Sequence, residues 1–276
     1  MTVPRIGLTL PSFVDDAQVP IDIARTAEDA GVDGVFLFDH LFRRAADGTR
    51  RPALEAVSML GALATATTRV AIGTLVLRAW LRPPASTAAA IVTATRIAPG
   101  RVIAGIGTGD SQSKEENDTF GLGFGTVHDR IERLRATVRA ARDHGAPVWV
   151  GGRTPAVRDL AAVESDGWNA WGADLQTFAE WSRTTRLAAQ REGFACSWSG
   201  LAVLDESDDA ARERATRLRA GAATIVGGPD TVADTIAALG DAGADWVILG
   251  ALDPRDRRTA AILGEQVGPK IAARVG

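Results

Sequence analysis

Apolar and polar positions alternate in two regular ways along the 276 residues of this chain. Short runs rich in Val, Ile, Leu and Ala are typical of strands buried in a parallel sheet, and the longer amphipathic stretches between them are typical of helices. We expect strands near residues 5–10, 32–38, 69–76, 101–107, 147–150, 167–171, 200–204 and 245–250. We expect helices near residues 18–30, 53–66, 84–97, 126–144, 154–164, 174–191, 208–219, 229–242 and 256–271. Eight strands with intervening helices predict an α/β fold, a (β/α)8 TIM barrel that forms a single domain over residues 1–276.

Two segments depart from a minimal barrel. Residues 108–125 follow the fourth strand as a long glycine-rich connection, which at this face of a barrel is typical of a lid or a substrate wall. Residues 205–244 hold two helical patterns between the seventh and eighth strands. Gly227-Gly228 lies between these two patterns, just before a helix start, and indicates either an anion site or a tight turn.

Two of the predicted strands end in chemically useful side chains. The strand that starts at Arg101 runs into Gly107-Thr108-Gly109-Asp110, where glycines let a flat ligand approach the backbone and Asp110 supplies a charge. The second predicted strand ends in Asp39-His40. Because the carboxyl ends of parallel strands meet at one face of a barrel, we expect these groups to form one site. The structural alternatives are a helix or turn cap for Asp110 and a hydrogen-bonded interior position for His40.

A third strand end favours an anion. Val148-Trp149-Val150 runs into Gly151-Gly152-Arg153, immediately before a predicted helix. Exposed backbone N–H groups and the helix dipole would hold a phosphate there, with Arg153 adding charge. A tight strand-to-helix turn with a solvent-facing arginine is the structural alternative.

Composition narrows the chemistry. The formal net charge of −3 and the pI near 5.7 give no broad basic field, so nucleic acid and anionic membrane surfaces are poor partners. The chain shows neither an apolar signal segment nor an apolar run of membrane-spanning length, so a cytoplasmic protein is expected. Three histidines without metal-ligand spacing predict no metal site, and two lysines away from predicted strand ends disfavour a Schiff base. The lone Cys196 is expected to be a small buried hydrophobe.

Together these segments resemble one known family. Phe36-Leu37-Phe38-Asp39-His40, residues 69–76, residues 99–109, Gly151-Gly152 and residues 166–169 follow the order of the bacterial luciferase-like flavin and deazaflavin oxidoreductases over nearly the whole chain. The Asp-His pair and the Gly-Thr-Gly-acid ending are similar to the branch that uses the 8-hydroxy-5-deazaflavin coenzyme F420, which includes sugar-phosphate dehydrogenases. The resemblance implies a barrel whose strand ends hold the deazaflavin ring, with FMN as the alternative cofactor.

The resemblance also implies roles for matching residues. His40 would act as acid or base, Asp110 would face the reacting carbon, and Trp171 would line the substrate pocket. Cofactor contacts would come from Asp39, Gly73, Thr74, Leu75, Gly107, Thr108, Gly109, Gly151, Gly152 and Arg153. Among these, Gly73, Thr74 and Leu75 would form a backbone bulge behind the ring, where the family often has a non-proline cis peptide. The dehydrogenase branch usually has Glu in place of Asp110, and the scarcity of lysine disfavours a sugar phosphate as substrate.

The implied function is hydride transfer between F420 and a small organic substrate. An FMN-dependent luciferase-like monooxygenase is the first alternative, because the same barrel with FMN would activate oxygen. A barrel glycosidase is a more remote alternative, since Asp110 and Asp205-Glu206 end two predicted strands and could place two carboxylates across a sugar. A ligand-binding barrel without catalysis, and the choice between a monomer and a homodimer, stay open.

Overall fold

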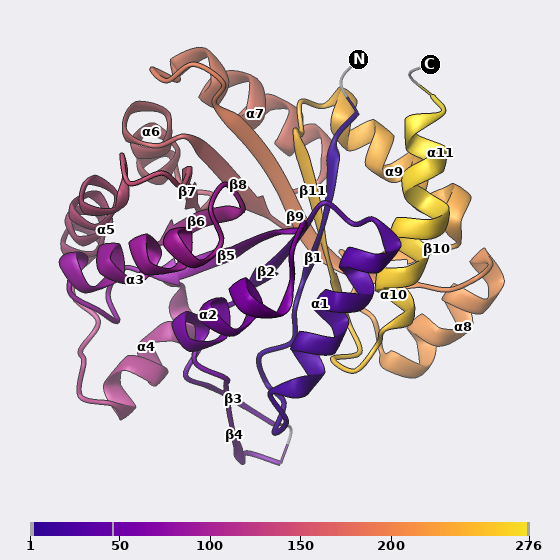
Figure 1. Cartoon of the computed structure of the whole chain (residues 1–276), viewed down its shortest axis with the longest axis horizontal. Coiled ribbons are helices and arrows are strands. Elements are labelled where there is room, and N and C mark those ends of the chain that lie inside the picture. Colours follow the sequence, from indigo (N-terminus) through magenta and orange to yellow (C-terminus); the bar gives the residue numbers. More distant parts are fainter. Residues whose placement is uncertain (1–2, 46, 275–276) are drawn as a thin grey trace.

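The computed structural model describes residues 3–45 and 47–274 of the chain. Eight parallel strands close into a barrel that helices surround (Figure 1). Around the barrel the order is β1 (Arg5–Thr9), β2 (Gly34–Leu37), β5 (Ala71–Arg78), β6 (Val102–Gly107), β7 (Val148–Gly151), β8 (Gly167–Trp171), β9 (Ala195–Leu204) and β11 (Trp246–Ala251). Pairing of β8 with β9 and of β11 with β1 closes the circle. The predicted (β/α)8 barrel is confirmed, and each barrel strand overlaps a predicted one.

Helices cover the outside of the barrel, each with one apolar face inward. They are α1 (Gln18–Ala30), α2 (Ala56–Ala66), α3 (Pro84–Ile97), α5 (Val127–Ala141), α6 (Pro155–Glu164), α7 (Leu175–Ala188), α8 (Asp208–Leu218) and α9 (Pro229–Asp241). In α1, for example, the buried Ile23, Ala24 and Ala27 follow the helical spacing of three to four residues. The last expected helix is divided into α10 (Arg258–Ala261), a π-helical segment η1 (Ile262–Val267) and α11 (Gly268–Ala272). Among the described residues, no helix is long and apolar enough to cross a membrane.

Four elements were absent from the expected pattern. An antiparallel hairpin of β3 (Phe42–Arg44) and β4 (Arg50–Pro52) lies between β2 and α2, and β10 (Ile225–Gly227) extends the sheet beside β9. The expectation of a continuous loop over 108–125 is wrong, because α4 (Ser111–Thr119) lies within it. Asp110 and Ser113 form a reciprocal capping box that starts α4, while the helix itself is too polar to show an apolar period.

The barrel interior is filled by aromatic side chains opposite glycines. Phe36, Trp149 and Trp246 pack with ring centroids 5.8–6.2 Å apart, and all are buried. A Cβ atom on Gly73 would lie 2.9 Å from the Phe36 ring, and one on Gly34 would lie 2.8 Å from the Trp246 ring. These glycines therefore make room for the aromatic core, which closes the barrel below its carboxyl ends.

Strand β5 contains the expected irregularity, one position later than predicted. Gly73 and Thr74 pair regularly with β6, and the register shifts between Thr74 and Leu77. The peptide bond between Leu75 and Val76 is cis. The bulge therefore involves Leu75 and Val76, and the prediction that Gly73 and Thr74 form it is wrong, since both still pair in the regular register. The Val76 side chain occupies the space where Cβ atoms on Gly107 and Gly151 would lie, 2.5 Å away in each case.

Candidate active site at the barrel mouth

The carboxyl ends of the barrel strands, called the barrel mouth below, collect the predicted site residues. Asp39-His40 follows β2, residues 108–110 follow β6, Gly151 ends β7 and Trp171 ends β8. All barrel strands run parallel, so these residues share one face of the molecule.

His40 is held by a carboxylate that the sequence analysis did not single out. Its Nδ1 lies 2.7 Å from Oε1 of Glu116, and Oε2 of Glu116 accepts the Leu41 N–H at 2.6 Å. Burial raises the pKa of Glu116, but the hydrogen bonds from His40 and Leu41 and the charge of Arg78 outweigh burial and hold that pKa below its usual value. An ionised Glu116 can only accept, so Nδ1 of His40 donates to it and Nε2 is the ring nitrogen left for a ligand. The His40 side chain is 25% exposed, so a ligand in the mouth can reach it.

One face of α4 turns toward the mouth and carries Ser113, Glu116 and Asn117, all buried. Arg78, the last residue of β5, reaches this face and donates from Nη2 to Oε2 of Glu116 at 2.9 Å. Its Nε donates to the backbone oxygen of Asp39 at 2.6 Å. Arg78 therefore ties the ends of β2 and β5 to α4.

Asp39 is engaged by two arginine residues. Its carboxylate accepts from Nη1 and Nη2 of Arg82 at 2.7 and 3.0 Å, and from the Arg78 N–H at 2.8 Å. Arg82 also pairs with Glu55, which begins α2. Burial lowers the pKa of Arg82, but hydrogen bonds and charge from Asp39 and Glu55 raise it overall. These three donors occupy three of the roughly four lone-pair positions of the Asp39 carboxylate. The contact of Asp39 with a cofactor ring stays a prediction.

Asp110 has the structural role that was its alternative interpretation. Its Oδ1 accepts the Ser113 N–H at 3.0 Å and the Ser113 hydroxyl at 2.9 Å, which caps α4. Gly109 beside it has φ +77°, a left-handed backbone that favours glycine. The catalytic role of Asp110 and the ring contacts of Thr108 and Gly109 stay predictions.

The start of α6 has several features that anion sites use, and its binding of a phosphate stays a prediction. Gly152 has φ +151°, Arg153 is exposed, and no side chain of the described residues caps this helix. Arg153 also forms no ion pair with the described residues. Free N–H groups at a helix start, next to an unpaired cation, favour a phosphate.

The second glycine pair serves a turn. Oδ1 of Asp208 accepts the Gly228 N–H at 2.7 Å, and Oδ2 accepts the Thr231 hydroxyl at 2.9 Å. The chain's own carboxylate thus occupies the start of α9, where an anion would bind. This contact favours the tight-turn interpretation of Gly227-Gly228.

Asp205 also lacks the environment of a glycosidase acid. It accepts from Nη1 of Arg258 at 3.0 Å. Burial raises the pKa of Asp205, but the Glu206 N–H and Arg258 outweigh it and lower the pKa. A general acid for sugar cleavage needs the opposite shift, so this carboxylate does not support the glycosidase alternative.

Aromatic side chains form the apolar part of the mouth. Phe38 and Trp171 meet edge to face with ring centroids 5.5 Å apart, and Phe13 lies 5.7 Å from the His40 ring. Trp171 is 37% exposed, so it can contact a ligand, and its substrate role stays a prediction. Trp149, Trp168 and Trp246 are buried in the core.

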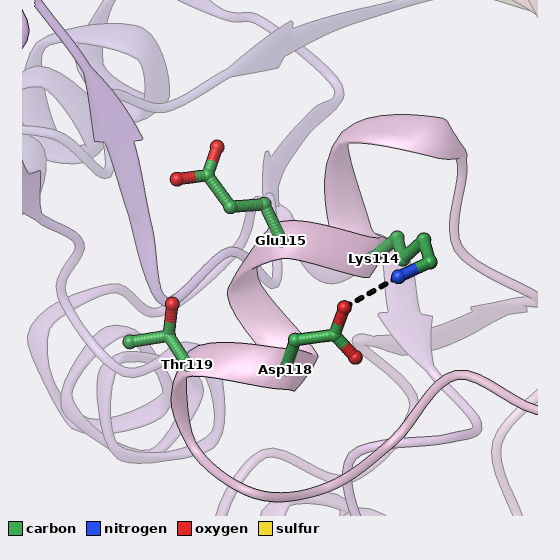
Figure 2. A pocket seen from close by; sticks show the side chains of 4 residues that line it. All are labelled: Lys114, Glu115, Asp118 and Thr119. Carbon is green, nitrogen blue, oxygen red and sulfur yellow. Dashed lines mark hydrogen bonds and ion pairs between the residues drawn. The ribbon is translucent and has the colours of Figure 1, made fainter.

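One surface hollow lies away from this chemistry. Lys114, Glu115, Asp118 and Thr119 line a hollow of about 570 Å³ (Figure 2). All four come from the outer face of α4, and Lys114 pairs with Asp118 there at 2.5 Å. Glu116 and Asn117 point the other way, into the protein. We therefore locate the site by the strand ends and not by this hollow.

Nowhere in residues 3–45 and 47–274 do three or more His, Cys, Asp or Glu side chains gather as a metal site requires. Cys196 is buried as expected, and burial raises its pKa to about 12, which keeps the thiol protonated and inert.

Comparison with known proteins identifies the family. The Luciferase-like monooxygenase family matches residues 4–144 and 132–223. An F420-dependent glucose-6-phosphate dehydrogenase of Nakamurella multipartita is 26% identical over 322 aligned positions, which cover 92% of this chain and 93% of that protein. A protein of the same name from Microbacterium testaceum is 30% identical over 209 positions, covering 65% of this chain and 61% of its own length. The 322 positions exceed the 276 residues of this chain, so the Nakamurella protein has segments that this chain lacks.

Solved structures agree in fold. An F420-dependent secondary alcohol dehydrogenase with an F420-acetone adduct superposes with a TM-score of 0.80 at 18% identity, over 97% of this chain and 99% of that one. The EDTA monooxygenase of Chelativorans sp. BNC1 superposes with a TM-score of 0.81 at 14% identity, over 99% and 94% of the two chains. The barrel, the mouth and the family match converge: this chain belongs to the luciferase-like monooxygenase family, oxidoreductases that act on small molecules with F420 or FMN.

Proposed function

We propose that this protein uses coenzyme F420 to transfer hydride to or from a small organic substrate. The observation that carries the proposal is the His40–Glu116 pair, a proton carrier held at the barrel mouth by a buried carboxylate. Hydride transfer to or from a carbonyl or alcohol moves one proton as well, so it needs such a group. Relatives at 26–33% identity named F420-dependent support F420 over FMN.

The residues at the mouth fit a flat cofactor with a phosphate tail. Gly107 at the end of β6 and Gly109 just after it add no side chains of their own, although Val76 fills the space beside Gly107. The uncapped start of α6 next to Arg153 suits the phosphate. When bound, F420 would supply the hydride carrier, and it reacts poorly with oxygen because a carbon replaces the reactive flavin nitrogen.

The chain's own residues then manage the proton and the geometry. Nε2 of His40 gives the proton to the substrate oxygen, or takes it in the reverse direction, while ionised Glu116 stabilises the charged imidazole. Arg78 fixes Glu116, and Arg82 fixes Asp39 at the end of β2. Phe38 and Trp171 supply the apolar surface that excludes water.

We do not propose a sugar phosphate bound by lysine as the substrate, because of where the two lysines lie. Lys114 points outward from α4 and pairs with Asp118, while Lys270 pairs with Asp230 on α9. Neither lysine therefore lines the mouth. The segments present in the Nakamurella relative and absent here also point to a different substrate pocket.

The test is a titration of purified apoprotein with F420 and with FMN, followed by absorbance and fluorescence. F420 should bind at least about tenfold more tightly, a difference of about 1.4 kcal/mol. A preference of that size for FMN would overturn the proposal and favour an oxygen-activating monooxygenase.

A further inference from the structure

The hairpin of β3 and β4 carries an unusual arrangement of charge. It begins two residues after His40 and projects from the barrel on the side of α4 (Figure 1). Its register places Arg43 opposite Arg51 and Arg44 opposite Arg50. Directly opposite residues of an antiparallel pair point to the same side, where like charges repel and destabilise the pairing. Two such pairs in so short a hairpin call for a compensating charge.

One of the two arginine pairs is compensated within the chain. Arg44 donates from Nε to Oε1 of Glu115 at 2.7 Å. Arg50 lies over the Phe42 ring, 4.8 Å from its centroid. The Arg44–Arg50 side of the hairpin therefore already has a carboxylate and an aromatic face.

The Arg43–Arg51 pair has no carboxylate partner among the described residues. Neither guanidinium lies within ion-pair distance of a carboxylate in residues 3–45 and 47–274, and both arginines are exposed. The pKa of Asp47, in the turn, is lowered by hydrogen bonds from the Thr49 hydroxyl and N–H and, more weakly, by the charge of Arg51. The Asp47 carboxylate therefore binds Thr49 and forms no ion pair with Arg51. Two arginines at directly opposite positions of one hairpin, neither ion-paired with a described residue, can bind a carboxylate or phosphate in a forked, charge-assisted contact.

The same side of the hairpin adjoins the proton carrier. The Arg43 guanidinium lies over the Phe13 ring at 5.1 Å, and the Phe13 ring lies 5.7 Å from the His40 ring. One aromatic ring thus separates the unpaired cation from the group that handles the proton. A small molecule with its anionic group at Arg43 and its reacting carbon near His40 would cover Phe13.

We propose that Arg43 and Arg51 form an anion subsite that binds the carboxylate or phosphate of the substrate. This inference rests on the proposed function and names the substrate class as an acidic oxo or hydroxy compound. The same anion chemistry occurs on the cofactor, whose tail carries a phosphate, so the test must separate these two sources.

The test uses arginine-selective labelling of the apoprotein with phenylglyoxal, mapped residue by residue by mass spectrometry. Inorganic phosphate at several times its Kd should slow labelling of Arg43 and Arg51 by about fivefold, because bound anion blocks reagent access. Sodium chloride at equal ionic strength should not slow this labelling. The labelling rate of the exposed Arg96, at the far end of α3, should be the same in either salt. Equal slowing of all three arginines would overturn the proposal.

Matched variants sharpen this result. Arg43→Gln should abolish the phosphate protection of Arg51, since the two guanidiniums share one anion. Arg44→Gln, the neighbour whose charge Glu115 already compensates, should leave that protection intact. Protection of Arg51 that survives Arg43→Gln would contradict a shared subsite.

Two further measurements separate substrate, cofactor and function. F420 and a deazaflavin without the phosphate tail are compared as ligands that protect Arg43 and Arg51 from labelling. Protection by F420 alone would assign the subsite to the cofactor tail and overturn the substrate assignment. In turnover with reduced F420, Arg51→Gln should lower kcat/KM for 4-oxopentanoate about tenfold and leave 2-pentanone unchanged. Phenylglyoxal labelling with phosphate as the protecting anion needs no F420. A failed F420 titration would therefore overturn the proposed function alone, whereas absence of phosphate protection would overturn the subsite.

Discussion

Nδ1 of His40 and Oε1 of Glu116 lie 2.7 Å apart, although 76 residues separate them in the sequence. The contact joins the end of β2 to α4, the helix that lies inside an expected loop. It fixes the ring orientation of His40 and leaves Nε2 as the nitrogen that can exchange a proton with a ligand. The position of α4 is thereby linked to the chemistry of the mouth.

Glu116 should act through His40, and variants can show this. His40→Ala should lower kcat about 100-fold, the usual scale for losing a general acid or base, with little change in F420 affinity. Glu116→Gln should lower kcat by about tenfold, since an amide can still accept from Nδ1 but carries no charge. Because the two residues form one unit, the double variant should be no slower than His40→Ala alone.

The matched control for Glu116 is its neighbour. Glu115→Gln removes a carboxylate on the outer face of α4 and should leave kcat unchanged in steady-state kinetics. Additive losses in the double variant would show that Glu116 acts independently of His40. Near-normal turnover of His40→Ala would remove His40 from the mechanism and leave Asp110 as the predicted proton carrier.

The phosphate of the cofactor should depend on the start of α6. Gly152→Val is unsuitable as a test, because a Cβ there would lie 2.8 Å from Cγ1 of Val157 and the φ of +151° is strained for valine. Arg153→Glu avoids both problems and reverses an exposed charge. It should weaken F420 binding about tenfold in a fluorescence titration, whereas Arg96→Glu should not. Equal affinity of the Arg153 variant and the unaltered protein would place the phosphate elsewhere.

The stability of the barrel should depend on pH through Glu28. Its carboxylate accepts the N–H groups of Thr68, Arg69 and Val70, just before β5. Burial raises the pKa of Glu28, but these hydrogen bonds outweigh burial and hold the pKa below its usual value. A lowered pKa in the folded state means that the stabilisation is complete above the unfolded pKa and is lost as pH falls through the folded pKa.

Glu28→Gln should therefore cost about 2 kcal/mol of unfolding free energy at pH 7, the range for hydrogen bonds to a charged group. The difference from the unaltered protein should shrink below the ordinary glutamate pKa of about 4.3. Urea unfolding at several pH values measures this, with exposed Glu192→Gln as control. A difference that stays constant down to low pH would exclude the carboxylate as its source.

The sequence allowed prediction of the barrel strands because strands buried on both faces are continuous apolar runs, such as residues 102–107. It did not allow prediction of α4, whose stability comes from a cap and from contacts at Glu116 and Asn117. Hairpin strands as short as β3 leave too few positions for an alternating pattern.

The candidate site divides in the same way. Asp39, His40 and Arg153 could be found because each directly follows an apolar strand. Glu116 and Arg82 could not, because their importance comes from partners distant in sequence. A weak signal existed in the spacing of Ser113, Glu116 and Asn117, which matches one face of a helix.

The packing of Val76 against Gly107 and Gly151 has a consequence for any redesign of this mouth. One branched side chain on β5 fills the space that would otherwise admit side chains on β6 and β7. A larger residue at Gly107 or Gly151 would therefore require a smaller one at position 76. These three positions form a single unit of sequence variation, so combinatorial libraries should vary them jointly, and homologous sequences should show them changing together.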